Sequence, residues 1–129
     1  MKMARIESAV RLVLAFYEAL NRHDVAAMMA LLTDDCRFEH FDPPPDGAVY
    51  SGKDAIAGFW QGFFRESPQA HLDIEKIHGF GMQGIARWRC EWVDAAGNQR
   101  HLRGVDLFQE RGGLLCEQHS YVKGAGGGK

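Results

Sequence analysis

The clearest structural signal in this chain is GMQGIARWRCEWVDAAGNQRHLRGVDLFQE, residues 81–110. Polar and apolar residues alternate through both of its halves, and DAAGN at its centre has the residue types of a turn. The stretch therefore predicts two antiparallel strands joined as a hairpin. One residue breaks the pattern, because Asp106 lies between Gly104 and Phe108 on a face that the alternation assigns to the interior.

The same alternation continues on both sides of this hairpin. HLDIEKIHGF (71–80) precedes it and LLCEQHSYVKG (114–124) follows it, with glycine-containing turns in between. We therefore expect a run of antiparallel strands connected by hairpins. Within the hairpin, Trp88, Cys90 and Trp92 point to one side, which we expect to be the concave face that helices cover.

The first half of the chain has helical spacing instead. Apolar residues at intervals of three and four predict an amphipathic helix over residues 6–20. Asp24 is the expected N-cap of a second, short helix in DVAAMMALL (24–32). Ser51 is the expected N-cap of a third helix in SGKDAIAGFWQGFFRES (51–67).

A strand and a stiff loop separate the second and third helices. CRFEHF (36–41) alternates like a strand, whereas DPPPDG (42–47) contains consecutive prolines, which hold an extended or turning backbone. Three N-terminal helices packed on a curved antiparallel sheet make an α+β domain. We expect a single domain over residues 1–124 and a flexible glycine-rich tail over residues 125–129.

Composition narrows the class of protein. The chain has 129 residues, of which 46% are hydrophobic and 25% charged, as in an ordinary globular domain. No apolar run is long enough for a transmembrane span, and the first residues lack the apolar block of a secretory signal, so we expect a cytoplasmic protein with no membrane partner. The net charge of −2 and the scattered Lys and Arg residues argue against a nucleic-acid partner.

Neither a metal nor another cofactor is expected. Cys36, Cys90 and Cys116 are odd in number and widely spaced, which favours reduced, buried thiols over disulfides or a zinc site. HExxH and CxxC spacings are absent from the sequence. The glycines of GFGMQG (79–84) precede a strand rather than the helix that a phosphate-binding loop requires.

Asp106 is the first candidate for a functional residue. An isolated ionised carboxylate in an apolar interior is very costly, so this group must be paired, hydrogen-bonded or protonated. A paired aspartate would be structural and would hold an arginine or a helix terminus. A protonated aspartate that faces an apolar cavity could instead donate a hydrogen bond to a carbonyl or to a developing oxyanion, which is a catalytic property.

His40 is the second candidate, because it faces the interior if Phe38 does. Its near-neutral intrinsic pKa would let it take a proton from carbon or oxygen of a bound molecule. Alternatively, it ends its strand half-exposed and bonded to the following loop. His119 is a third candidate, but alternation alone does not decide whether His119 or its neighbours Gln118 and Ser120 face inward.

Three segments resemble a known family. They are AFYEALNRHDVAAMMALLTDDCRFEH (15–40), SGKDAIAGFW (51–60) and RGVDLFQERGGLLCEQHSYVKG (103–124). With the order of the elements, they are similar to the SnoaL-like polyketide cyclases and ketosteroid isomerase-like proteins of the nuclear transport factor 2-like superfamily. The resemblance extends over residues 6–124 and implies a cone-shaped α+β fold, a homodimer, and a hydrophobic pocket for a small molecule.

The resemblance also implies roles for single residues. Asp106 corresponds to the protonated aspartic acid of the ketosteroid isomerase oxyanion hole, and His40 falls at the position of the general-base aspartate. Phe16 falls at the position of the oxyanion-hole tyrosine, while Tyr17 is turned by about 100° around the helix. By the same matching, Gln118, Ser120 and Val122 face the pocket and His119 does not.

Two hypotheses for function follow. In the first, a cofactor-free enzyme uses His40 to remove a proton from a small hydrophobic carbonyl compound, and Asp106 stabilises the enolate. In the second, the aromatic residues form a non-catalytic binding pocket or a dimer core. The candidate pocket residues, besides His40 and Asp106, are Phe16, Tyr17, Phe38, Phe59, Trp60, Phe63, Trp88, Trp92, Phe108, Gln118 and Ser120.

Overall fold

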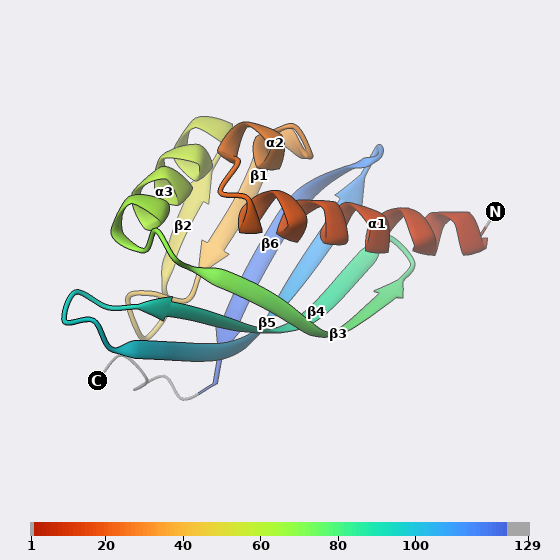
Figure 1. Cartoon of the computed structure of the whole chain (residues 1–129). Helices are drawn as coiled ribbons and strands as arrows, with labels where there is room; N and C mark the ends of the chain where they lie inside the picture. Colours follow the sequence, from red (N-terminus) through yellow and green to blue (C-terminus); the bar gives the residue numbers. More distant parts are fainter. Residues whose placement is uncertain (1, 124–129) are drawn as a thin grey trace.

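A curved sheet with helices on its concave side forms the structure (Figure 1). The computed structural model describes residues 2–123, with side chains from Ser8 onward, so the predicted tail over 125–129 lies outside the described residues. No helix within this range has the length and apolar character needed to cross a membrane. In chain order the elements are α1 (Lys2–Asn21), α2 (Val25–Met29), β1 (Leu32–His40), β2 (Ala48–Ser51), α3 (Lys53–Glu66), β3 (His71–Phe80), β4 (Gln83–Val93), β5 (Gln99–Arg111) and β6 (Leu114–Val122).

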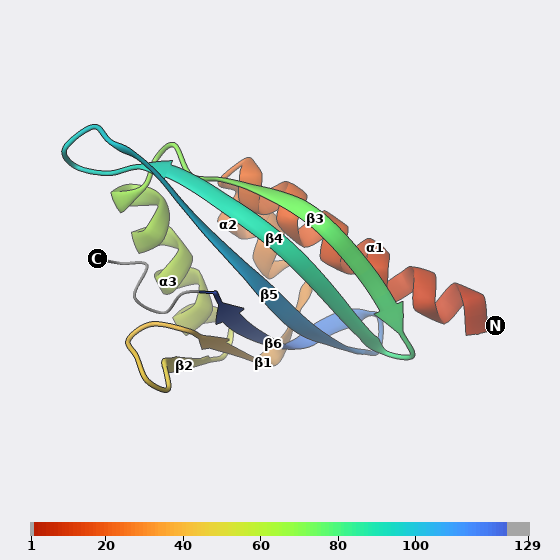
Figure 2. The same cartoon turned by 90° about the horizontal axis from the view of Figure 1, so that it is seen from below.

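The antiparallel run predicted for the second half is confirmed. Strands β3, β4, β5 and β6 pair in succession, and the long strands β3 to β5 cross beneath α1 (Figure 2). Strand β6 then pairs in parallel with β1, with Phe38 opposite Gln118, and β1 pairs antiparallel with β2. The order across the sheet is therefore β2-β1-β6-β5-β4-β3, and the parallel pair joins the two halves of the chain.

The N-terminal half differs from the prediction in three details. Helix α2 has only 5 residues, because Leu32 already begins β1. Ser51 is the last residue of β2, a strand that was not predicted, and Gly52 takes its place as the N-cap of α3 without a side-chain hydrogen bond. The predicted cap of α2 is confirmed, since the Asp24 carboxylate accepts a hydrogen bond from the Ala27 backbone nitrogen at 3.0 Å. Two of the three expected helices are thus long and one is a single short turn.

Glycines in β4 and β5 allow close packing on the sheet. A Cβ atom at Gly84 would lie 2.9 Å from Cγ2 of Val13, so glycine lets α1 approach β4 directly. A Cβ atom at Gly104 would lie 2.5 Å from Cζ2 of Trp88, whose ring covers the backbone at that position. The concave face of β5 is consequently lined by Gly104, Asp106 and Phe108, all of them buried as the alternation predicts.

Aromatic rings fill most of the space between α1, α3 and the sheet. Phe16 lies edge-on to Phe108, with the two ring centroids 5.7 Å apart, and edge-on to Trp60 at 6.4 Å. Phe38 stacks on Trp60 from the sheet side at 5.7 Å. These contacts connect both long helices to strands β1 and β5 in one hydrophobic core.

Candidate functional site

Asp106 is buried in the middle of β5, where it has neutral hydrogen-bond partners. The residue is only 3% exposed. The Tyr17 hydroxyl donates to Oδ2 of Asp106 at 2.5 Å, and Nε2 of Gln118 donates to the same oxygen at 3.1 Å. Tyr17 comes from α1 and Gln118 from β6, so three separate elements meet at one carboxyl group.

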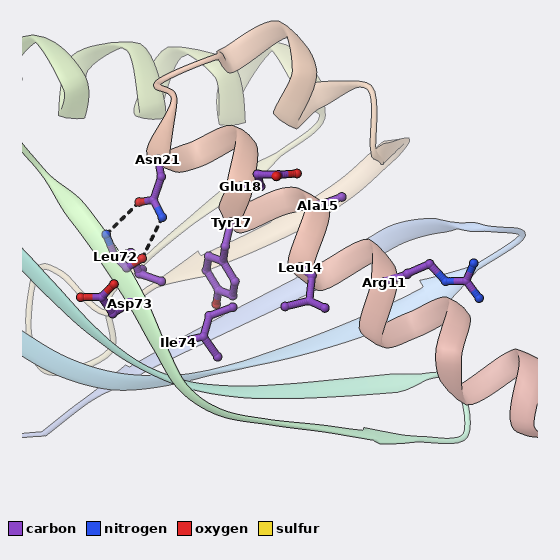
Figure 3. A pocket seen from close by; sticks show the side chains of 9 residues that line it. All are labelled: Arg11, Leu14, Ala15, Tyr17, Glu18, Asn21, Leu72, Asp73 and Ile74. Carbon is purple, nitrogen blue, oxygen red and sulfur yellow. Dashed lines mark hydrogen bonds between the residues drawn. The ribbon is translucent and has the colours of Figure 1, made fainter.

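The sequence brings Tyr17 to Asp106 through the small residues of β4. Ala86 pairs with Asp106 across the sheet and is fully buried beneath α1. The Tyr17 side chain points from α1 toward the sheet (Figure 3), and its ring packs edge-on against Phe108 with centroids 5.7 Å apart. Both the short side chain of Ala86 and the ring of Phe108 therefore guide the hydroxyl toward the carboxyl group.

Burial keeps the Asp106 carboxyl group from ionising easily. It raises the pKa of Asp106 above the ordinary 3.8, while the side chains of Ser120, Tyr17, Trp88 and Gln118 oppose this rise in part. Burial also raises the pKa of the Tyr17 hydroxyl, and the neighbouring Asp106 adds to that effect. The second carboxyl oxygen, Oδ1, is buried and has no hydrogen-bond partner of normal geometry among the described residues. A proton on Oδ1 would therefore lack an acceptor of normal geometry among these residues.

His40 ends β1 among aromatic rings. The centroid of its imidazole lies 4.1 Å from that of Phe41 and 4.6 Å from that of Phe59. Burial lowers the pKa of His40 to about 4, with Asp42 opposing the change, so the ring is neutral near pH 7. Its Nδ1 atom is buried and has no hydrogen-bond partner within the described part of the chain.

The sheet register places His40 and Asp106 on the same face with one strand between them. Phe38 lies opposite Gln118, and Asp106 lies opposite Ser120. Since side chains repeat every two residues along a strand, His40 and Asp106 both point to the concave side. Two strand spacings separate their backbones by about 10 Å. The two groups do not touch each other, and Ser120 of β6, buried on the same face, lies between them.

The candidate pocket residues fall into two groups. Most are fully buried in the core, namely Phe16, Tyr17, Phe38, Trp60, Trp88, Phe108, Gln118 and Ser120. Phe59, Phe63 and Trp92 are half-buried, as is His40. The buried group belongs to the core, whereas Phe59, Phe63 and Trp92 pack against that core from its edge. We call Phe59, Phe63, Trp92 and His40 the aromatic rim.

The resemblance puts Phe16 at the position of the oxyanion-hole tyrosine, and this match stays a prediction. Tyr17, not Phe16, contacts the Asp106 carboxyl group. The ring of Phe16 instead packs against Trp60 and Phe108 in the aromatic core. A one-residue difference rotates a side chain by about 100° around a helix, and both residues belong to the apolar stripe of α1. The rotation of α1 about its axis decides between them, and spacing alone does not reveal it.

The orientation of β6 agrees with the expected one. Gln118 and Ser120 are buried on the concave side, while His119 faces the convex side. There Nδ1 of His119 lies 2.6 Å from Oε1 of Glu39, and Nε2 lies 3.1 Å from Oε1 of Glu117. Within the described residues no group of three His, Cys, Asp or Glu side chains is arranged to hold a metal ion.

Sequence comparison now identifies the family. Residues 13–118 match the SnoaL-like domain, a span that includes Tyr17, His40 and Asp106. The chain belongs to the SnoaL-like domain family. Among curated proteins, none matches this SnoaL-like chain.

Solved structures agree with this assignment. A nuclear transport factor 2-like protein of unknown function from Mesorhizobium loti is 32% identical, with 93% of this chain and 94% of that chain covered and a TM-score of 0.79. A candidate polyketide cyclase from Xanthomonas campestris pv. campestris is 26% identical, with coverages of 92% and 93% and a TM-score of 0.77. A candidate ketosteroid isomerase from Kribbella flavida, 18% identical with coverages of 91% and 78% and a TM-score of 0.78, shares the fold.

In this SnoaL-like protein, the pKa of His40 should be lowered and that of His119 raised. His40 is expected to protonate near pH 4 because it is buried. For His119, partial burial acts to lower the pKa, but the hydrogen bonds to Glu117 and Glu39 outweigh it and raise the pKa above 6.5. A single NMR titration of the imidazole C–H resonances measures both, and a His40 that titrates near 6.5 would contradict the buried environment described above.

The same shift predicts how stability depends on pH. The folded pKa of His40 lies below its unfolded value of 6.5, so its contribution to the free energy of unfolding is complete above pH 6.5 and is lost as the pH falls through 4. Urea unfolding of the native chain and of His40→Gln should show the native chain losing on the order of 2 kcal/mol more over this interval.

Proposed function

We propose that this SnoaL-like protein is a cofactor-free isomerase or cyclase that acts on a small hydrophobic carbonyl compound by proton abstraction. The observation that carries the proposal is the buried Tyr17–Asp106 hydrogen bond, 2.5 Å long, among neutral partners. A carboxyl group whose pKa is raised by burial can keep its proton and donate it to a developing oxyanion.

Each of the three residues has a distinct role in this proposal. Asp106 donates the proton on Oδ1 to the substrate oxygen in a hydrogen bond. Tyr17 binds Oδ2 and thereby fixes the orientation of the carboxyl group. His40 is the general base, and its unpartnered Nδ1 is free to accept a proton from carbon.

The low pKa of His40 makes it a weak base, which places a condition on the mechanism. A base with a pKa of about 4 removes a proton from carbon only when the resulting enolate is strongly stabilised. Asp106 supplies that stabilisation at the other end of the substrate. The separation of about 10 Å between the two backbones suits a molecule with its acidic C–H at His40 and its oxygen at Asp106.

A substrate would reach this position through the aromatic rim. Phe59 and Phe63 are half-buried on α3, and Trp92 is half-buried near the end of β4. Displacement of these side chains would open a hydrophobic pocket without breaking the fully buried core. The pocket is thus part of the proposal, and its apolar walls favour a substrate of low polarity.

Dense packing favours a second candidate function. Tyr17 and Gln118 already occupy Oδ2 of Asp106, and aromatic rings contact one another throughout the interior. In a non-catalytic binding or dimerisation module of the same fold, this hydrogen-bonded carboxyl group would only stabilise the core. The 26% identity to a candidate polyketide cyclase supports the enzyme as the first choice.

Hydrogen–deuterium exchange at carbon distinguishes the two functions. A panel of hydrophobic cyclic ketones, including tetralones, is incubated in D₂O with the protein, and loss of the C–H signals next to the carbonyl is followed by NMR. We expect accelerated exchange that falls about 100-fold or more in His40→Ala, which lacks the base, and in Asp106→Asn, which lacks the acidic proton.

The matched control is His119→Ala, a histidine on the convex face that should leave the rate unchanged. Tyr17→Phe should lower the rate while keeping the ring in place. If ketones that bind the protein exchange no faster than in buffer, the enzymatic proposal fails and the binding module is favoured.

We also propose that two copies pair through the convex face of the sheet. Leu107 is 38% exposed and Tyr121 is 56% exposed, and they lie on the neighbouring strands β5 and β6 with half-buried Val105 between them. Sedimentation equilibrium should show twice the mass of one chain for the native protein and a monomer for Tyr121→Lys. A native protein that sediments as a monomer at every concentration would contradict the pairing.

The cytoplasmic location expected from the sequence stays a prediction. Cys36, Cys90 and Cys116 are all buried and free, which agrees with a reducing compartment. Burial raises the pKa of Cys36 to about 12 and that of Cys90 to about 11, so these thiols remain protonated and unreactive.

A further inference from the structure

A groove lies between α1 and β3, outside the aromatic interior. It holds about 600 Å³, and its walls include Leu14 and Ala15 of α1, Leu72 and Ile74 of β3, and the edge of Tyr17 (Figure 3). This volume is within the range of roughly 300–1,000 Å³ that is typical of small-molecule sites. None of these residues except Tyr17 belongs to the proposed catalytic machinery.

One end of the groove is closed by an amide that pairs with the edge of the sheet. Nδ2 of Asn21 donates to the Leu72 backbone oxygen at 2.8 Å, and the Leu72 backbone nitrogen donates to Oδ1 of Asn21 at 2.8 Å. Strand β3 is the last strand of the sheet, so its outer backbone groups have no neighbouring strand. At Leu72, the Asn21 side chain takes the place of a neighbouring strand.

The next pair of outward backbone groups belongs to Ile74. In an antiparallel pair, residues alternate between pointing their N–H and C=O groups toward the partner strand and away from it. Leu72 directs both groups away from β4 to Asn21, so Ile74, two residues further on, directs its own groups away as well, into the groove. Among the described residues no side chain pairs with Ile74 as Asn21 pairs with Leu72.

Within the groove, only one residue of the β3 edge, Ile74, has accessible outward backbone groups. The register of β3 against β4 shifts between Ile74 and Lys76, which ends the regular edge on one side. Asn21 occupies it on the other side, and α1 runs alongside (Figure 3). An added β-strand therefore has no room, whereas a single planar amide does.

Geometry also determines the kind of amide. Asn21 binds Leu72 through a carbonyl oxygen and an N–H that point the same way, which a primary carboxamide or a lactam can reproduce. An open-chain secondary amide in its ordinary trans form directs these two groups in opposite directions and cannot. Apolar side chains of Leu14, Ala15 and Leu72 form part of the wall, and Leu14 is 43% exposed.

Three charged side chains line the groove, those of Arg11, Glu18 and Asp73, and each already has an interaction of its own, so none is left to select an ionic ligand. Glu18 lies 3.9 Å from the guanidinium of Arg22, and Asp73 lies 3.1 Å from the imidazole of His71. Both carboxylates thus have neighbours outside the groove.

We propose that the α1–β3 groove binds a small neutral molecule that carries a lactam or primary carboxamide on an apolar body. Its amide pairs with the Ile74 backbone as Asn21 pairs with Leu72.

The test compares ε-caprolactam with N-methyl-ε-caprolactam, followed by ¹⁵N NMR of the whole chain. ε-Caprolactam should shift the amide signals of Leu14, Tyr17, Leu72 and Ile74 with a low-millimolar dissociation constant. The N-methyl compound has the same body but no N–H donor, so it should bind at least about fivefold more weakly. N-isobutylacetamide, a trans amide, should also bind more weakly.

Two variants address the protein side of the contact. Ile74→Pro removes the backbone N–H at an edge position, where proline is tolerated, and should weaken binding about fivefold or more. Leu14→Trp fills the groove from an exposed position and should abolish binding, while Val49→Trp, at an exposed position of β2, should not change it. Leu14→Trp and the two lactams decide the question even if Ile74→Pro does not fold.

Three results would overturn this inference. They are equal affinity for the two lactams, binding that survives Leu14→Trp, and shifts centred on His40 and Phe59 instead of the groove. Because the groove is separate from His40 and Asp106, loss of the exchange activity in their variants has no bearing on the outcome.

Discussion

A carboxyl group buried without a counter-charge constrains the whole structure of this SnoaL-like protein. Asp106 is 3% exposed and depends on neutral donors from α1 and β6. To supply them, α1 must lie directly on the glycine and alanine of β4, and β6 must turn Gln118 rather than His119 inward. An ionised group in this place would cost several kcal/mol, so the fold and the protonation state of Asp106 are linked.

The same physical effect acts on both proposed catalytic groups. Burial raises the pKa of Asp106 and lowers that of His40, and in each case the uncharged form is favoured. On the concave face, burial thus favours the protonated form of the carboxyl group and the unprotonated form of the imidazole. Such a pair suits a neutral substrate in which charge develops only in the transition state. Pairs of titratable groups driven apart by their surroundings are typical of acid–base catalysis, although buried networks that only stabilise a core can show the same shifts.

Much of this arrangement could be predicted from the sequence, because strand alternation is a local property. The interior position of Asp106, the hairpins of the second half and the cap at Asp24 all depend on residues close together in the chain. Strand β2 has only 4 residues and exists because β1 pairs with it, so its own sequence carries little signal. The same pairing places Ser51 in the strand rather than at the helix N-terminus.

The contact between Tyr17 and Asp106 was beyond sequence reasoning for a different reason. The two residues are 89 positions apart, and the choice between Phe16 and Tyr17 depends on how far α1 is rotated about its axis. Contacts between distant elements, such as the close approach of Val13 to Gly84, accompany that rotation. Likewise, the outward direction of the Ile74 backbone groups follows from the hydrogen bonds between Asn21 and Leu72, which the sequence does not predict.

The most direct measurement is the titration of the Asp106 carboxyl carbon by ¹³C NMR, with Asp106→Asn used to assign the signal. Burial predicts a midpoint above the ordinary 3.8, and Tyr17→Phe should move it higher because one of the hydrogen bonds that oppose the rise is removed. A carboxyl group that is fully ionised at and above pH 3.8, in the native chain and in Tyr17→Phe alike, would contradict the account.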